Sequence, residues 1–191
     1  MPKFYAERTH EKMKEVLMSP ESEGPAVHYY MIRGGSEKTN ITIWEEGLVG
    51  GEYIKTYGHY HVGNLEEKYT ILQGEGILIT QERSVDTNGN PIDDEIKSFE
   101  AKHVRSGDVV DISKDAGHIV VNTGKTWLVT SDNSPVNFEE KNPVSLPSHA
   151  DYGPFRKLHG AAYYIVEKNG KPTLVKNPNY KKVPGAKIEL A

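Results

Sequence analysis

Short apolar or alternating runs recur along the chain from Val27 onward, with Gly, Asn, Asp and Pro between them. Runs of this length, bounded by turn-forming residues, are typical of β-strands. In chain order they are VHYYMI, NITIWEE, EYIKTYGHYH, KYTILQ, GILITQE, DVVDI, HIVVN and TWLVTSD. The pattern predicts an all-β fold, either a sandwich or a barrel.

Two Asn-Gly pairs mark the predicted hairpins. Asn88-Gly89 and Asn169-Gly170 each fit a two-residue turn in which both residues have positive φ. The second pair lies between AYYIVE and PTLVKN, which we expect to pair as antiparallel strands. Both Asn-Gly pairs should therefore lie at hairpin tips.

The N-terminal segment carries the single helix that the pattern predicts. Thr9 can cap this helix, and the Ser19-Pro20 pair would end it. Between them, Met13, Val16 and Leu17 fall at helical spacing.

Length and composition favour one domain. A chain of 191 residues, 36% of them hydrophobic, can bury one sizeable core. We expect an arm with the helix at 1–26, a β-barrel core at 27–160, and a C-terminal hairpin and tail at 161–191.

The charge balance and the absence of cysteine narrow the possible partners. The 27 acidic and 23 basic residues are mixed along the chain, so no basic stripe offers itself to nucleic acid. No apolar run approaches the ~18 residues of a membrane helix, and the N-terminus is too charged for a signal peptide, so we expect no membrane partner and a cytoplasmic location. Without cysteine, His and carboxylates are the only strong metal ligands.

Two histidines one residue apart point to a metal site. Side chains two apart on a strand share a face, so His59 and His61 can converge on one ion. Glu66 and Glu67 are the next candidates. Strand parity favours Glu67, because it shares a face with the apolar Tyr69 and Ile71 positions, whereas Glu66 shares its face with Lys68 and Thr70.

His118, in GDVVDISKDAGHIVVN, can supply a fourth ligand from a later strand. Three imidazoles and one carboxylate suit Fe²⁺, Mn²⁺, Ni²⁺, Zn²⁺ or Co²⁺ and leave coordination positions open for water or substrate oxygens.

These two stretches resemble the two cupin motifs. In the first, His59, His61, Glu67 and Gly74 match the motif, with a gap before the glutamate that is one residue longer than usual. In the second, Gly107, His118 and Asn122 match, while Ser113 and Asp115 replace the usual Pro and Gly. The resemblance implies an all-β cupin barrel, a double-stranded β-helix or jelly roll.

The region from about Val27 to Lys181 also resembles the cupin-type glucose-6-phosphate isomerases known from archaea and some bacteria. The matching residues are Thr-x-Gly-His-aromatic-His at 56–61, Glu67 with Tyr69, Asp-Tyr-Gly at 151–153, and the closing YYIVEKNGKPTLVKNPNY. The resemblance implies a homodimeric isomerase of glycolysis and gluconeogenesis. It would interconvert glucose 6-phosphate and fructose 6-phosphate with one divalent metal ion per subunit.

Residue roles follow from the same resemblance. The metal ligands would be His59, His61, Glu67 and His118, and the catalytic residues Glu67 and Tyr69. Substrate would be bound by Thr42, Thr56, the backbone of Gly58, Tyr69 and Tyr152. Tyr29 and Tyr30 compete for one further position, and His149 lies one residue further from Asp151 than the family histidine does.

The chemistry of the residues leaves alternatives open. Glu67 could move a proton through a cis-enediol, or the metal could favour a direct hydride shift. A cupin acting on another sugar phosphate, a cupin dioxygenase and a non-catalytic sugar-binding cupin are the competing functions, because one fold hosts all of them.

Overall fold

The computed structural model describes residues 4–34, 40–63, 65–134 and 150–189. Strands dominate these residues, and the helical segments are α1 (His10–Met13), the 3-10 turn η1 (Lys14–Val16) and α2 (Gly153–Lys157). No described helix has the length and apolar character needed to span a membrane. The strands are β1 (Phe4–Thr9), β2 (Val27–Arg33), β3 (Asn40–Trp44), β4 (Leu48–Val49), β5 (Glu52–Tyr53), β6 (Tyr60–His61), β7 (Glu67–Gln73), β8 (Glu75–Val85), β9 (Pro91–Arg105), β10 (Val109–Ile112), β11 (Ala116–Asn122), β12 (Leu128–Asp132), β13 (Ala150–Asp151), β14 (Tyr163–Lys168), β15 (Lys171–Lys176) and β16 (Ile188–Glu189).

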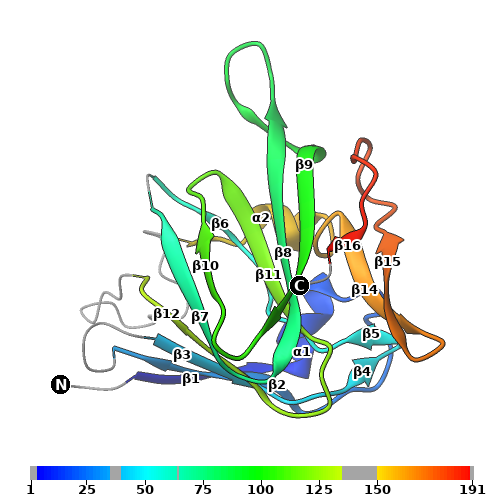
Figure 1. Cartoon of the computed structure of the whole chain (residues 1–191). Helices are drawn as coiled ribbons and strands as arrows, with labels where there is room; N and C mark the ends of the chain where they lie inside the picture. The colour runs from blue at the N-terminus through cyan, green and yellow to red at the C-terminus, as the bar shows by residue number, and fades with distance from the viewer. Residues whose placement is uncertain (1–3, 35–39, 64, 135–149, 190–191) are drawn as a thin grey trace.

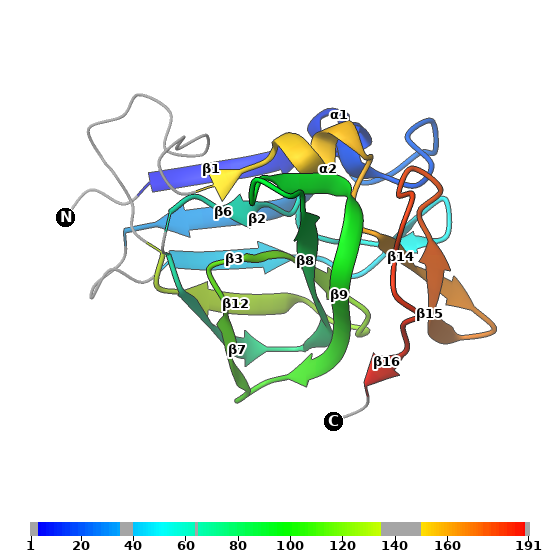
Figure 2. The ribbon, with the colours of Figure 1, turned by 90° about the horizontal axis from the view of Figure 1, so that it is seen from above.

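Two sheets enclose the core. One has the strand order β1-β2-β3-β12-β7-β10, and the other has the order β11-β8-β9-β16. Seen from above, β1, β2, β3, β12 and β7 lie in succession, and β8 and β9 stand across one end of this row (Figure 2). The C-terminal hairpin β14-β15 pairs with β5 beside the barrel (Figure 1). The predicted all-β cupin barrel is confirmed.

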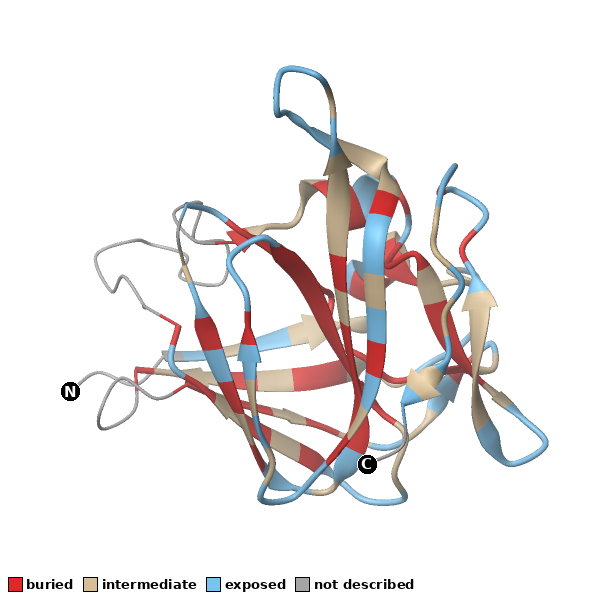
Figure 3. Cartoon of the chain, turned by 45° about the horizontal axis from the view of Figure 1, so that its top comes forward, coloured by how far each residue is buried: buried red, intermediate tan, exposed pale blue. Residues whose placement is uncertain are grey.

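The barrel interior is built by the alternation of side chains along each strand. β3 and β12 each bury every second residue, which turns Trp44 and Leu128 inward with no exposed surface. β11 is buried at every position (Figure 3), because one face, with Ile119, lies near Gly58 while the other, with His118, faces the interior. A large apolar side chain buried in this way contributes about 1.5–3 kcal/mol.

The two predicted hairpins both form, but only one has the predicted turn. Asn169 and Gly170 have φ of 54° and 76°, and β14 pairs with β15 from Lys168↔Lys171 onward, which confirms that turn. At the tip of β8-β9, which projects beyond the barrel (Figure 1), only Gly89 has positive φ. The two-residue turn is wrong there, because the carboxylate of Asp86 accepts hydrogen bonds from the backbone N–H groups of Asn88 and Asn90 and stabilises a longer loop.

The predicted N-terminal helix and its Thr9 cap form, but the helix is shorter than expected: α1 continues into η1, which ends at Val16, and Leu17 is already extended, so Ser19-Pro20 does not end it. The Thr9 hydroxyl accepts a hydrogen bond from the backbone N–H of Lys12 at 3.3 Å, and the expected apolar side chains, including Met13, are buried. The sequence pattern missed β1, which precedes this helix and pairs with β2. The strand is hard to recognise in the sequence because Arg8 lies on its inward face. An apolar residue at this position would have completed the alternation of apolar and polar side chains.

The pattern also missed α2, a short helix that begins at Gly153-Pro154. Proline at the start of a helix is a recognised signal, since its missing N–H would have no partner in the first turn. This helix follows Tyr152 directly, and so it fixes the chain next to the predicted site.

Candidate metal centre

The segment that carries the histidine pair runs antiparallel beside β11 as irregular backbone, with isolated bridges at Lys55↔Val121 and His59↔His118. The predicted strand over residues 52–61 is interrupted, and only β5 and β6 form at its ends. Thr56 N–H donates to Val120 O at 2.9 Å, and His118 N–H donates to His59 O at 3.0 Å. Gly58, with φ of 83°, permits this approach, since a Cβ there would lie 2.5 Å from the Ile119 side chain.

Four side chains from three parts of the chain converge beside this pairing. One ligand atom from each lies within 4.8 Å of all the others. Oε2 of Glu67 is 3.1 Å from Nε2 of His61 and 3.2 Å from Nε2 of His118, and the His59 and His118 rings are 4.5 Å apart. We call these residues the His/Glu cluster; they are His59, His61, Glu67 and His118.

The chemistry of the His/Glu cluster fits a metal ion. Among the described residues, neither ring nitrogen of His118 has a hydrogen-bond partner, and Nδ1 of His61 has none either. Burial lowers the pKa of His118 to about 3, and His61 adds to this effect, so the His118 imidazole is neutral at pH 7. Buried neutral imidazoles with unused lone pairs are costly without a partner and are ready ligands for a divalent cation. This buried group could therefore bind a metal.

The structure separates the two candidate glutamates. Glu67 is only 3% exposed and lies within the cluster, whereas Glu66 is exposed to solvent. The alternation along β7 explains this difference, because it places Glu67 on the inward face together with Tyr69 and Ile71.

Comparison with known proteins places this centre in a family. The family model described as "Glucose-6-phosphate isomerase (GPI)" matches residues 26–182, which include the whole His/Glu cluster. The chain belongs to this family. It is also 29% identical over 141 residues to a glucose-6-phosphate isomerase of Pyrococcus abyssi, an alignment that covers 73% of this chain and 62% of that relative.

Solved structures with a related fold are more distant. The cupin domain of CENP-C from Drosophila melanogaster is 12% identical, with a TM-score of 0.39 over 62% of this chain and 79% of that one. A predicted oxalate decarboxylase from Thermotoga maritima is 20% identical, with a TM-score of 0.36 over 55% of this chain and 76% of that one. Neither likeness bears on the reaction.

The tyrosines that the glucose-6-phosphate isomerase resemblance indicated lie close to the His/Glu cluster. The Tyr69 ring is 5.5 Å from that of His118, and the Tyr152 ring is 5.4 Å from that of His59. Tyr29 is the inward-facing residue of its pair, and its hydroxyl accepts a hydrogen bond from the backbone N–H of Tyr57 at 3.2 Å.

By contrast, Tyr30 lies on the outer face of the barrel. It stacks on Tyr5, which is 60% exposed. The structure therefore brings Tyr29 to the site and leaves Tyr30 outside. His149 lies outside the described residues.

The two threonines expected to bind substrate have different surroundings. Thr42 is buried on the inner face of β3, opposite Thr130 of β12. The Thr56 hydroxyl oxygen accepts a hydrogen bond from the backbone N–H of Val120 at 3.0 Å. Thr56 thus supports the contact between its segment and β11, while its O–H group can still donate.

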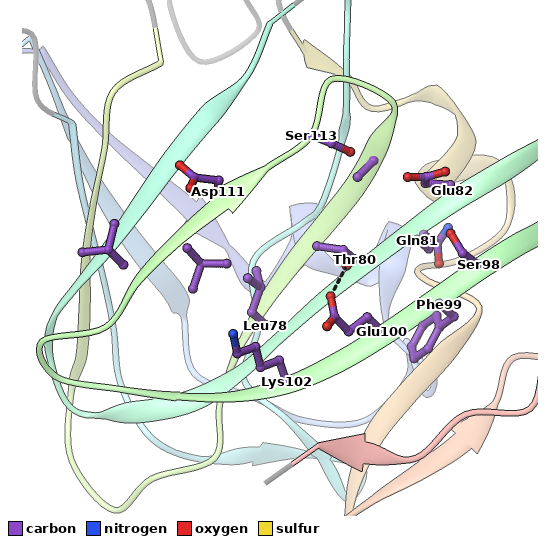
Figure 4. Close-up of a pocket in the computed structure, with 13 residues that line it drawn as sticks. Leu78, Thr80, Gln81, Glu82, Ser98, Phe99, Glu100, Lys102, Asp111 and Ser113 are labelled. Atoms are coloured by element: carbon purple, nitrogen blue, oxygen red, sulfur yellow. Dashed lines mark hydrogen bonds between the residues drawn. The ribbon is translucent and has the colours of Figure 1, made fainter. Parts of the chain in front are cut away.

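Two cavities border β10 near the site. The first, about 580 Å³, lies between β8, β9 and β10, and in it Thr80 donates to Glu100 (Figure 4). It contains no member of the His/Glu cluster, and its charged lining residues are Glu82, Glu100, Asp111 and Lys102. This excess of carboxylates disfavours a phosphate dianion.

The second cavity, about 520 Å³, is lined by residues of β7 and β10 together with Asn133. It includes Glu67, and it shares Asp111 and Ser113 with the first cavity. None of the three histidines of the His/Glu cluster lines it.

A polar network that the sequence did not reveal holds the Glu67 carboxylate. The Ser134 hydroxyl donates to Oε1 of Glu67, which leaves Oε2 directed at the imidazoles. Asp132 accepts a hydrogen bond from Ser134 N–H at 3.1 Å and another from Asn40 at 2.7 Å, and Arg33 lies 3.4 Å from its other oxygen. The network joins β2, β3 and β12 to the metal centre.

This network predicts a role for Ser134 in positioning Glu67. We expect Ser134→Ala to weaken divalent-metal affinity about 10-fold, because loss of a hydrogen bond that orients a ligand usually costs 10- to 100-fold. Titration against a chelating dye would measure the affinity, with Ser131→Ala, from the partly exposed face of β12, as the matched control. Equal affinities in the two variants would contradict the role.

Proposed function

We propose that the chain is a metal-dependent glucose-6-phosphate isomerase that interconverts glucose 6-phosphate and fructose 6-phosphate. The observation that carries the proposal is the convergence of three imidazoles and one carboxylate within the segment that matches the isomerase family. The expected homodimer stays a prediction.

A divalent ion held by the His/Glu cluster would polarise the C1 and C2 oxygens of the sugar. Fe²⁺, Mn²⁺, Ni²⁺, Zn²⁺ and Co²⁺ all suit three imidazoles and one carboxylate, and availability selects among them. The residues themselves have to orient the sugar and move the hydrogen between C1 and C2.

Glu67 is the candidate proton carrier. Burial raises the pKa of its carboxyl, and the charge of Asp132 adds to the increase, so the carboxylate is more basic than an exposed one. In the enediol route, Glu67 takes the proton from C2 of the aldose and returns it to C1 of the ketose. In the hydride route, the hydrogen passes directly from C2 to C1, and Glu67 exchanges protons only with the oxygens.

Two tyrosine hydroxyls are available to orient the sugar. Burial raises the pKa of Tyr69 and of Tyr152, so both phenols remain protonated at neutral pH and can donate hydrogen bonds to substrate oxygens. Their rings lie beside those of His118 and His59 respectively.

A coupled assay tests the proposed function. The protein, reconstituted separately with each of the five ions, is given fructose 6-phosphate, and glucose 6-phosphate formation is followed. Mannose 6-phosphate serves as competitor, and an oxygen electrode monitors O₂ uptake. We expect turnover without O₂ consumption. Failure with every ion would overturn the isomerase assignment, and O₂ uptake would favour a dioxygenase.

The same reaction run in D₂O separates the two routes. Proton transfer through a cis-enediol predicts deuterium from solvent at C2 of the glucose 6-phosphate formed, because the proton on Glu67 exchanges with water. A direct hydride shift predicts product without solvent deuterium on carbon. Mass spectrometry of the product distinguishes these outcomes.

Thr56 provides a prediction about phosphate recognition. We expect Thr56→Val to raise KM for fructose 6-phosphate about 10-fold or more, since a hydrogen bond to a charged group is worth about 1.5–3 kcal/mol. The valine also leaves the backbone N–H of Val120 without its present acceptor, so Thr56→Ser is the matched control that keeps the hydroxyl. Steady-state kinetics check the result, and an unchanged KM in Thr56→Val would limit Thr56 to supporting the strand.

A further inference from the structure

Arg8 brings a positive charge to the site from a part of the chain that the family match does not cover. It belongs to β1, whereas the match begins at residue 26. Ala6, two residues earlier, packs against the barrel core, and Tyr5 and Glu7 are exposed on the other face. The alternation of β1 therefore directs the Arg8 side chain to the inner side of the barrel.

Two of the tyrosines near the metal centre hold the guanidinium. Arg8 lies directly opposite Tyr29 in the β1-β2 pairing, and its guanidinium interacts electrostatically with the phenol groups of Tyr29 and Tyr152. The guanidinium carbon is 5.9 Å from the centre of the Tyr152 ring. These contacts fix the cation in one place instead of leaving it on a mobile surface side chain.

The same tyrosines connect Arg8 to the segment that leads into the His/Glu cluster. The hydroxyl of Tyr29 accepts from the backbone N–H of Tyr57, between Thr56 and Gly58. The Tyr152 ring lies 5.4 Å from the ring of His59. Arg8 is thus separated from a candidate metal ligand by one side chain.

The charge at this position favours an anion. Contacts with Tyr29 and Tyr152 raise the pKa of Arg8 despite the opposing effect of burial, so the guanidinium is charged at any physiological pH. A partly buried guanidinium beside phenol hydroxyls matches a phosphate, whose oxygens can accept from the arginine fork and from the hydroxyls together.

We propose that Arg8 binds the phosphate group of the sugar phosphate, so that β1 completes a substrate site whose other residues lie within the family match. The identity of this substrate rests on the proposed function. Arg8 here acts in binding and not in hydrogen transfer, since a guanidinium keeps its protons at any physiological pH.

The test measures binding by calorimetry in the metal-loaded protein, with fructose 6-phosphate and fructose as the two ligands. Arg8→Met removes the charge with little change in side-chain length. Arg8→Lys keeps the charge but lacks the planar guanidinium and its paired N–H donors. Arg105→Met is the matched control. It removes a charge from a cavity of about 870 Å³ elsewhere on the protein, whose charged or titratable lining residues also include Glu75, His103, Lys125 and Lys171.

We expect the parent to bind fructose 6-phosphate more tightly than fructose. Arg8→Met should weaken fructose 6-phosphate binding about 10- to 100-fold, the range for one charge-assisted pair. Arg8→Lys should lose less affinity, Arg105→Met should lose none, and binding of fructose should be the same in all variants. Circular dichroism verifies that each variant is folded, and Arg8→Lys keeps the test valid where Arg8→Met does not fold.

The outcomes distinguish this inference from the proposed function. If Arg8→Met retains the parental preference for fructose 6-phosphate, or if Arg105→Met loses it equally, the inference is overturned even where the parent is an active isomerase. A parent without preference for the phosphorylated sugar overturns it as well. Phosphate binding that depends on Arg8 in a protein without isomerase activity supports the inference and refutes the function.

Discussion

His118→Ala is expected to lose its bound metal and more than ~100-fold of its isomerase activity while remaining folded. The basis is the position of His118, whose neutral buried imidazole lies 3.2 Å from Glu67 and 4.5 Å from the ring of His59. Loss of a group that merely orients a ligand costs 10- to 100-fold, so loss of a ligand itself should cost more. His61→Ala should behave in the same way, because His61 is equally buried and lies 3.1 Å from the same carboxylate oxygen.

Metal content of the purified variants, measured by mass spectrometry, checks this prediction alongside the coupled assay. His103→Ala is the matched control, since His103 lies on β9 outside the His/Glu cluster and faces Glu75. The variants should keep the parental circular dichroism spectrum. The backbone pairing of residue 118 with β8 and with His59 does not depend on its side chain. One equivalent of metal retained in both His61→Ala and His118→Ala would place the metal elsewhere.

The sequence predicted those parts of the fold that depend on local rules. The Thr9 cap and the Asn169-Gly170 turn depend on a few neighbouring residues, and both formed as expected. The strands β2, β3, β7 and β12 followed their apolar alternation, because each has one face on the barrel interior.

Strands without regular alternation were missed. In β9 the buried residues Ile96, Ala101 and Val104 do not keep a spacing of two, since bulges shift its pairing with β8 near Arg83. β1 escaped detection because Arg8 faces inward. Irregularities of this kind are set by tertiary contacts and leave no periodic trace in the sequence.

The residues of the candidate site also fall into those that the sequence predicted and those that it did not. His59, His61 and Glu67 could be placed together from strand parity, and the structure brings them and His118 within 4.8 Å. Ser134 gave no signal, because its hydrogen bond to Glu67 spans 67 positions of sequence and depends on how β12 lies beside β7. Arg8 was missed for the same reason, since only the pairing of β1 with β2 brings it to Tyr29.

Glu67→Gln should reduce kcat by at least ~100-fold, the usual scale of general acid–base contributions, whereas Glu66→Gln should remain within a few-fold of the parent. Glutamine keeps the size of Glu67 and can still contact the Ser134 hydroxyl, but it lacks the negative charge and the basic oxygen that faces both imidazoles. Metal retention should weaken as a second effect. Glu66 is exposed at the edge of the cavity beside β7, where an amide replaces a carboxylate at little cost.

Measuring kcat and metal content for both variants, after the same reconstitution, separates binding from chemistry. If Glu67 acts only as a ligand, saturating metal should restore most of the activity of Glu67→Gln. If it also carries the proton, activity should stay low in fully metallated protein, and the incorporation of solvent deuterium should fall with it. A larger loss in Glu66→Gln than in Glu67→Gln would mean that the β7 register is shifted by one residue. Such a shift would turn Tyr69 away from His118 as well, so a Tyr69→Phe variant with parental kinetics would have to accompany that result.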